Sequence, residues 1–133
     1  MEIVKLPRSF AGAFNVLDNK FTVEAPRFIV HTDRISFELE GVDDTGGAFT
    51  VTAIAARTKK GTYKCKGIVP EYRTSAARYP CSIEFTVVEI VPSNDGIEEN
   101  DQCRVEAVWT DNYGGWYFSG FLGVFEPESL SPV

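Results

Sequence analysis

Residues 103–125 read CRVEAVWTDNYGGWYFSGFLGVF, and apolar side chains alternate with polar ones on either side of a Gly-Gly pair. Alternation with a period of two is typical of a β-strand that has one face in a core. An antiparallel hairpin in which Asp111 faces Trp116 brings nearly all of the apolar groups onto one face. The members of that face are Cys103, Val105, Ala107, Trp109, Phe118, Gly120, Leu122 and Val124. We expect the opposite face to be wetter, because it carries Arg104, Glu106, Thr110, Tyr117 and Ser119.

A second hairpin is predicted near the amino terminus, in the stretch FNVLDNKFTV. A turn at Asp18 and Asn19 sets Phe14 against Val23, so the apolar faces of the two strands coincide. Both turn residues tolerate left-handed backbone angles. The agreement between the turn and the apolar pattern supports a strand pair here.

The next segment, FIVHTDRISFELE, repeats this pattern. A turn at Thr32 and Asp33 sets Phe28 opposite Phe37. The alternative is one long bent strand. In either case the second half alternates apolar and charged or polar side chains, as does a strand with one face in water.

Further alternating segments at 48–56, 62–69 and 81–91 bring the total to eight or nine short strands, mostly joined by tight turns. We therefore predict an all-β fold, a single-domain antiparallel meander that forms a closed barrel or a two-layer sandwich. The domain is expected to span residues 1–125, and residues 126–133 to form a flexible tail. Such a meander resembles in architecture the lipocalins and avidins, which are small ligand-binding barrels. The sequence contains neither a lipocalin motif nor an avidin motif.

Length and composition are those of a globular protein. A chain of 133 residues fits one domain, and an apolar share of 44% supplies material for a core without a disulfide or metal. No apolar run approaches the ~20 residues of a membrane-spanning helix, and the amino terminus lacks the apolar run of a secretory signal. We expect a cytoplasmic protein with no membrane contact. A pI near 4.8 weighs against general nucleic-acid binding.

The three cysteines, Cys65, Cys81 and Cys103, have neither CxxC spacing nor that of a metal site. We interpret them as reduced structural residues, since buried free cysteine behaves as a small apolar side chain. A Cys65–Cys103 disulfide is the alternative for a secreted protein. We expect no metal and no cofactor.

Four aromatic residues of the last hairpin have no evident place in the core. Tyr113 is at the loop tip, and Trp116, Tyr117 and Phe121 follow it. One interpretation is a stacking platform at a barrel mouth for a sugar or another planar ligand. The other is that the rings plug the barrel end or pack against another element. These four are the candidate ligand-binding residues.

Positive charge is concentrated between positions 57 and 78, where seven basic residues and one acidic residue give +6 in a chain of net charge −6. The seven are Arg57, Lys59, Lys60, Lys64, Lys66, Arg73 and Arg78. If they converge, this basic span binds an anion, a nucleic acid or an acidic protein surface. In a homo-oligomer that surface would be the protein's own acidic loop at 92–102. The remaining interpretation is a solvated strand edge.

Catalytic motifs are largely missing. His31 is the single histidine and lies near a predicted turn, where a surface or capping role fits better than acid–base work. Asp43 and Asp44 lie in a glycine-rich turn, which accounts for them without calcium. Glu89 and Glu106 are the carboxylates that would converge in a barrel enzyme, because Glu89 shares the parity of its apolar neighbours. Alternation places Glu106 in water.

We therefore expect a non-catalytic binding or interaction module, with a small ligand at a barrel mouth as the leading form. The alternative is a domain that self-associates or binds a protein partner through the basic span. An enzyme that uses buried carboxylates ranks third.

Overall fold

The computed structural model describes residues 6–19, 21–43, 46–59, 62–65, 71–73, 78–112 and 114–125. Within them the strands are β1 (Arg8–Val16), β2 (Phe21–Val30), β3 (Arg34–Asp43), β4 (Ala48–Lys59), β5 (Thr62–Cys65), β6 (Glu71–Arg73), β7 (Arg78–Val91), β8 (Gln102–Asp111) and β9 (Gly114–Val124). Two short 3-10 turns, η1 (Leu17–Asn19) and η2 (Glu98–Asn100), follow β1 and β7. These residues include no helix with the length and apolar character that crossing a membrane requires. The predicted tail 126–133 lies outside them.

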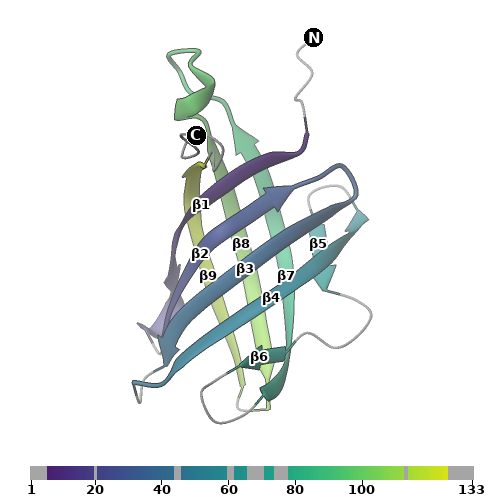
Figure 1. Ribbon diagram of the computed structural model, residues 1–133, viewed down its shortest axis with the longest axis vertical. Coiled ribbons are helices and arrows are strands. Elements are labelled where there is room, and N and C mark those ends of the chain that lie inside the picture. The colour runs from purple at the N-terminus through teal and green to yellow at the C-terminus, as the bar shows by residue number, and fades with distance from the viewer. Residues whose placement is uncertain are drawn as a thin grey trace, which may run out of the picture.

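Eight of the strands form a closed antiparallel barrel. Neighbouring strands pair in the ring order β3, β2, β1, β9, β8, β7, β5, β4, and β4 pairs again with β3. The short β6 pairs with both β4 and β7. In Figure 1, β1 to β4 cross in front of β7 to β9, and the wall encloses one interior. The predicted meander is confirmed in its barrel form, and the sandwich alternative is wrong.

Both hairpins predicted nearer the amino terminus are confirmed. Phe14 lies opposite Val23 and Phe28 opposite Phe37, so the segment 28–40 is a hairpin and not one bent strand. Asp18 adopts a φ of 79°, the left-handed conformation that the first turn was expected to need.

The inward face of the wall is apolar and rich in aromatic rings. Phe85 meets Phe28 and Phe37 edge to face at centroid distances of 5.5 and 5.0 Å, and all three side chains are fully buried. Burying a phenylalanine contributes roughly 1.5–3 kcal/mol. Among the described residues, Asp101 is the one buried polar side chain. This part of the interior is therefore a hydrophobic core.

The hairpin of β8 and β9 differs from the predicted register by two residues. Asp111 lies opposite Gly114, and Trp109 lies opposite Trp116 and not Phe118. A shift of two leaves every side chain on its predicted face, so the apolar pattern does not distinguish the two registers. The loop distinguishes the two registers, because Gly114 has a φ of 143°, which residues with a side chain rarely adopt. The strands therefore pair up to a very short loop.

A β-bulge in β7 changes the expected position of Glu89. Phe85 lies opposite Ala107, but Val87 lies opposite Glu106, so β7 has one extra residue between these pairs. Beyond the bulge the alternation is reversed. The Glu89 side chain is 59% exposed on the outer face. The inward orientation suggested by parity is wrong.

Two of the three cysteines have described side chains, and both Cys81 and Cys103 are buried. Cys103 has a free thiol, so the Cys65–Cys103 disulfide alternative is wrong. Burial raises the pKa of Cys103 to about 12, which keeps the thiol protonated and unreactive.

Candidate binding groove on the outer wall

The four predicted ligand-binding aromatics do not form one cluster. Trp116 points into the barrel end, where its ring meets Phe21 at 5.6 Å. Tyr117 and Phe121 point outward from β9 and are 62% and 56% exposed. Tyr113 lies outside the described residues. The alternation of β9 therefore separates a core ring from two outer rings.

Trp116 belongs to a cluster of four rings that plugs this end of the barrel. Its other members are Phe21, Phe49 and Trp109, and successive centroids lie 5.5 to 5.8 Å apart. The indole N–H of Trp109 donates to Asp111 Oδ2 at 3.0 Å, which satisfies its polar atom. For Trp116 the plug interpretation holds, because its contacts are with core rings.

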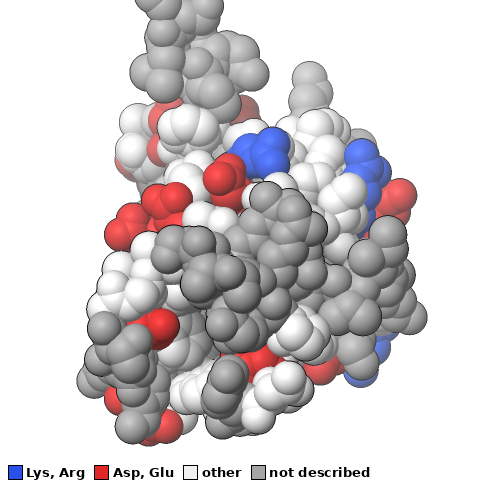
Figure 2. Space-filling view, turned by 60° about the horizontal axis from the view of Figure 1, so that its bottom comes forward, with Lys and Arg blue, Asp and Glu red and all other residues white. Residues whose placement is uncertain are grey.

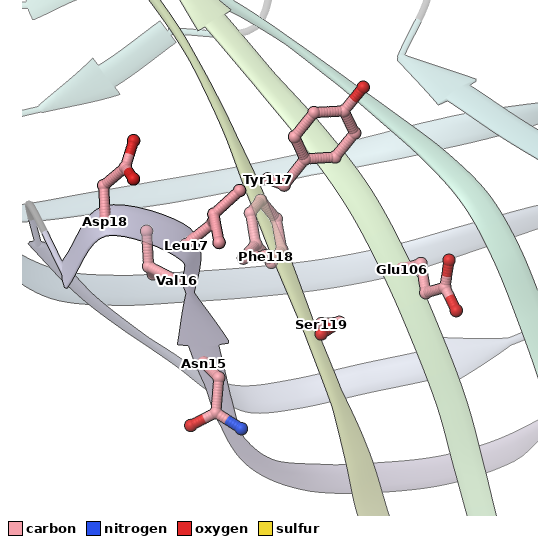
Figure 3. Close-up of a pocket in the computed structure, with 8 residues that line it drawn as sticks. All are labelled: Asn15, Val16, Leu17, Asp18, Glu106, Tyr117, Phe118 and Ser119. Carbon is pink, nitrogen blue, oxygen red and sulfur yellow. The ribbon is translucent and has the colours of Figure 1, made fainter.

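A groove of about 420 Å³ lies on the outer wall, over the seam where β1 meets β9 (Figure 3). We call it the outer-wall groove, and its lining is Asn15, Val16, Leu17, Asp18, Glu106, Tyr117, Phe118 and Ser119. Small-molecule sites occupy about 300–1,000 Å³, so the groove has a suitable size. Our sequence reasoning found Tyr117 but missed Asn15, Leu17 and Asp18 as site residues. The pairing of β1 with β9 brings them close to Tyr117, and because these strands are far apart in the sequence, no local sequence pattern predicts it.

Strand pairing places three polar side chains in a row across the outer-wall groove. Ser119 on β9 lies opposite Asn15 on β1 and opposite Glu106 on β8. Opposed residues of antiparallel strands have Cβ atoms about 4.5–5.5 Å apart, so the row is continuous. Figure 3 shows Ser119 between Asn15 and Glu106, with Leu17 and Tyr117 together to one side. A ligand in the groove would meet hydrogen-bonding groups and an aromatic ring at once.

Arg104 holds both of the carboxylates that the sequence singled out. Its Nη2 lies 2.6 Å from Glu106 Oε2, and its Nη1 lies 3.3 Å from Glu89 Oε1. All three side chains are substantially exposed, so each pair contributes at most about 1 kcal/mol. The network orients Glu106 at the edge of the groove. It also shows that Glu89 and Glu106 are not a buried catalytic pair.

Among the described residues that line the outer-wall groove there are two carboxylates, Asp18 and Glu106, and no basic side chain. Figure 2 views the adjoining end of the barrel, where, among the described residues, red Asp and Glu side chains appear at more places than blue Lys and Arg side chains. Within the described chain, the side chains of Asn15, Asp18, Tyr117 and Ser119 make no hydrogen bond. Their polar atoms are therefore open to a ligand.

The residues of the basic span that the structure describes are spread along the barrel wall. Arg57, near the end of β4, lies 5.9 Å above the ring of Tyr63. The backbones of Arg73 and Arg78 lie opposite each other, and Arg73 also pairs with Thr50 on β4. Thr50 and Arg57 are seven positions apart on one strand, or roughly 23 Å at about 3.3 Å per residue. Arg57 and the pair of Arg73 and Arg78 therefore lie at opposite ends of the barrel, so these residues do not form one site.

The other lysines of the span are only partly placed. Lys59 is exposed at the end of β4, and Lys64 is described by its backbone alone. Lys60 and Lys66 lie outside the described residues.

The acidic loop 92–102 is held together by its own side chains. Asp101 accepts a hydrogen bond from the backbone N–H of Ser93 at 2.7 Å and pairs with Arg8 at 3.0 Å. The hydrogen bond from Ser93 and, to a smaller extent, that from Arg8 lower the pKa of Asp101. Asp95 likewise accepts hydrogen bonds within the loop. Two carboxylates of the loop are thus engaged by hydrogen bonds and an ion pair within the protein.

His31 and Asp43 have structural roles. Ser36 Oγ lies 3.3 Å from His31 Nε2, and partial burial lowers the pKa of His31. Asp43 Oδ1 accepts a hydrogen bond from Gly47 N–H at 2.7 Å, which closes the predicted turn. Asp44 lies outside the described residues. The described residues contain no group of three His, Cys, Asp or Glu side chains that could hold a metal ion.

Comparison with protein-family models, curated proteins and solved structures finds no match to this chain. The chemistry of the outer-wall groove therefore has to follow from its own side chains.

Proposed function

We propose that this protein is a non-catalytic binding module that holds a small ligand in the outer-wall groove. The observation that supports it most is the exposed ring of Tyr117 beside Asn15 and Ser119, whose side chains have no hydrogen-bond partner within the described chain. An aromatic ring offers contact area, and a few placed polar groups fix orientation and specificity. This combination is what a small-molecule site needs.

The proposed location differs from the barrel mouth that the sequence suggested. Trp116 is engaged by the plug cluster, and the buried rings of Phe28 and Phe37 pack against Phe85 in the interior. A ligand entering there would have to displace these contacts. The outer wall is free of that cost.

The proposal is tested by thermal shift with four ligand classes, namely saccharides, organic amines, nucleotides and hydrophobic molecules. At a concentration of 100 Kd a ligand stabilises the folded state by about 2.7 kcal/mol, which a melting curve resolves. We expect at least one class to stabilise the wild type but not Tyr117→Ala. Ile54→Ala is the matched control, because Ile54 is a similarly exposed apolar residue on β4. Equal stabilisation of Tyr117→Ala, or no stabilisation by any class, would contradict the proposal.

We propose self-association as the second candidate function. It is supported by the location of Arg57 and Lys59 at the same end of the barrel as the acidic loop with Glu98 and Glu99 (Figure 1). An end-to-end dimer would match each basic group with the acidic group of its partner, as a two-fold interface requires. Size-exclusion chromatography at low and high salt tests this, and a monomer at both salt concentrations would contradict it.

We also propose a cytoplasmic setting, which the free thiol of Cys103 supports because reducing compartments keep thiols unpaired. Recovery of the tagged protein in the cytosolic fraction of its source cells is the expected result.

A further inference from the structure

We infer that the ligand of the outer-wall groove is a neutral saccharide chain, which runs along β9 from Tyr117 to Phe121. This rests on the proposed function and adds the chemical class and the length of the ligand.

Charge in the lining excludes the ionic classes. An anion would meet Asp18 and Glu106, and none of the lining residues that the structure describes is basic. A cation would find the charge of Glu106 already met by Arg104 at 2.6 Å, which leaves Asp18 as the one lining charge without an ion pair in the described chain. Neither sign of charge therefore has a dedicated site.

The hydrogen-bonding groups exclude a purely apolar ligand and fit a polyol. An apolar molecule would cover the row of Asn15, Ser119 and Glu106 without replacing its bonds to water, which is costly. Carboxylates accept, whereas the amide and the hydroxyls both donate and accept. Sugar hydroxyls also donate and accept, so they match every member of the row. The apolar C–H face of a pyranose ring can at the same time lie on the ring of Tyr117.

Phe121 extends the site beyond a single sugar. It lies on the same outward face of β9 as Tyr117, four positions further on, or roughly 13 Å at about 3.3 Å per residue. Its ring is 56% exposed although burial is the usual role of phenylalanine. Its outward neighbours along β9 are small, because Ser119 and Gly123 flank it and an added Cβ at Gly123 would meet nothing within 4 Å.

The space between the two rings is lined by the polar row. Ser119 lies midway between Tyr117 and Phe121, and Arg104 lies directly opposite Phe121 on β8. One sugar unit is shorter than the separation of the rings, so only a chain of several units reaches both. The expected consequence is an affinity that rises with chain length.

The test is isothermal titration of glucose, N-acetylglucosamine, mannose and galactose, each as chains of one to six units. For the wild type we expect at least one series in which affinity rises tenfold or more from one to four units. Phe121→Ala should keep the affinity for the single sugar and lose this rise. Tyr117→Ala should lose at least tenfold at every length, and Ile54→Ala should match the wild type.

Circular dichroism and melting temperature first confirm that each variant is folded, which the exposure of the three residues favours. If saccharide binding needs Tyr117 but not Phe121, or if the affinity does not change with the number of sugar units, the inferred multi-unit ligand is wrong and the proposed binding function of the groove stands. Binding of another class at Tyr117 with no saccharide bound overturns the inferred class alone. No Tyr117-dependent binding of any class overturns the inference and the proposed function together.

Discussion

Gly41 occupies a point in β3 where the wall of the barrel leaves no room for a side chain. A Cβ at this position would lie 1.8 Å from the backbone oxygen of Thr22 on β2 and 2.8 Å from Cζ of Phe49. Real Cβ atoms keep at least 3.0 Å, so β2 would have to retreat by the difference, about 1.2 Å. Overpacking costs about 1–3 kcal/mol and occasionally more. We expect Gly41→Ala to lose about 3 kcal/mol or more, because the obstructing atom is backbone.

Urea unfolding followed by tryptophan fluorescence measures this loss. In a domain of this size a change of 3 kcal/mol lowers Tm by on the order of 10 °C. Gly123→Ala is the matched control, since its Cβ would meet nothing within 4 Å. Glycine inside a strand is destabilising by roughly 0.5–1 kcal/mol relative to alanine, so the control should be neutral or slightly stabilising. A Gly41→Ala protein as stable as Gly123→Ala would refute the close approach of β2 and β3.

Three further outcomes are expected. The folded-state pKa of Asp101 lies below its unfolded value of about 3.9, so its contribution to stability is present above that pH and is lost as pH falls through the lowered pKa. Urea midpoints from pH 7 to pH 2 should show this acid loss, and Asp101→Asn should weaken it. The Cys103 thiol should stay unreactive toward a thiol reagent at pH 8 until the protein unfolds, and rapid native labelling would argue against its burial. Glu89→Gln should change the free energy of unfolding by less than about 1 kcal/mol, because the residue is exposed; a larger loss in urea unfolding would argue for burial.

Alternation predicted the wall of the barrel because side-chain direction in a strand is a local property. Ile35, Phe37 and Leu39 are fully buried, as their period of two indicated. The same rule failed beyond Phe85, because a bulge inserts one residue and reverses the faces. It also left the β8–β9 register open by two residues, since an even shift preserves both faces.

The candidate site was only half predictable. Alternation predicted the solvent-exposed face of β9 with Tyr117. It did not predict that Trp116 points into the barrel end while Tyr117 and Phe121 point outward. The groove itself is made by the closure of β1 on β9, where Asn15 meets Ser119 across more than a hundred residues of chain. Contacts of such sequence separation carry no local signal. The seven basic residues suggested one surface because they are close in sequence, yet strand length carries Arg57 and Arg73 to opposite ends.

The most direct test of binding on the outer wall is backbone amide chemical-shift mapping by NMR, on titration with saccharide chains of four units. We predict the largest shifts at positions 15–18, at Glu106 and at positions 117–121, with those of Phe28 and Phe85 unchanged. Shifts concentrated at the interior positions, or no saturable shifts in the outer-wall groove, would contradict it.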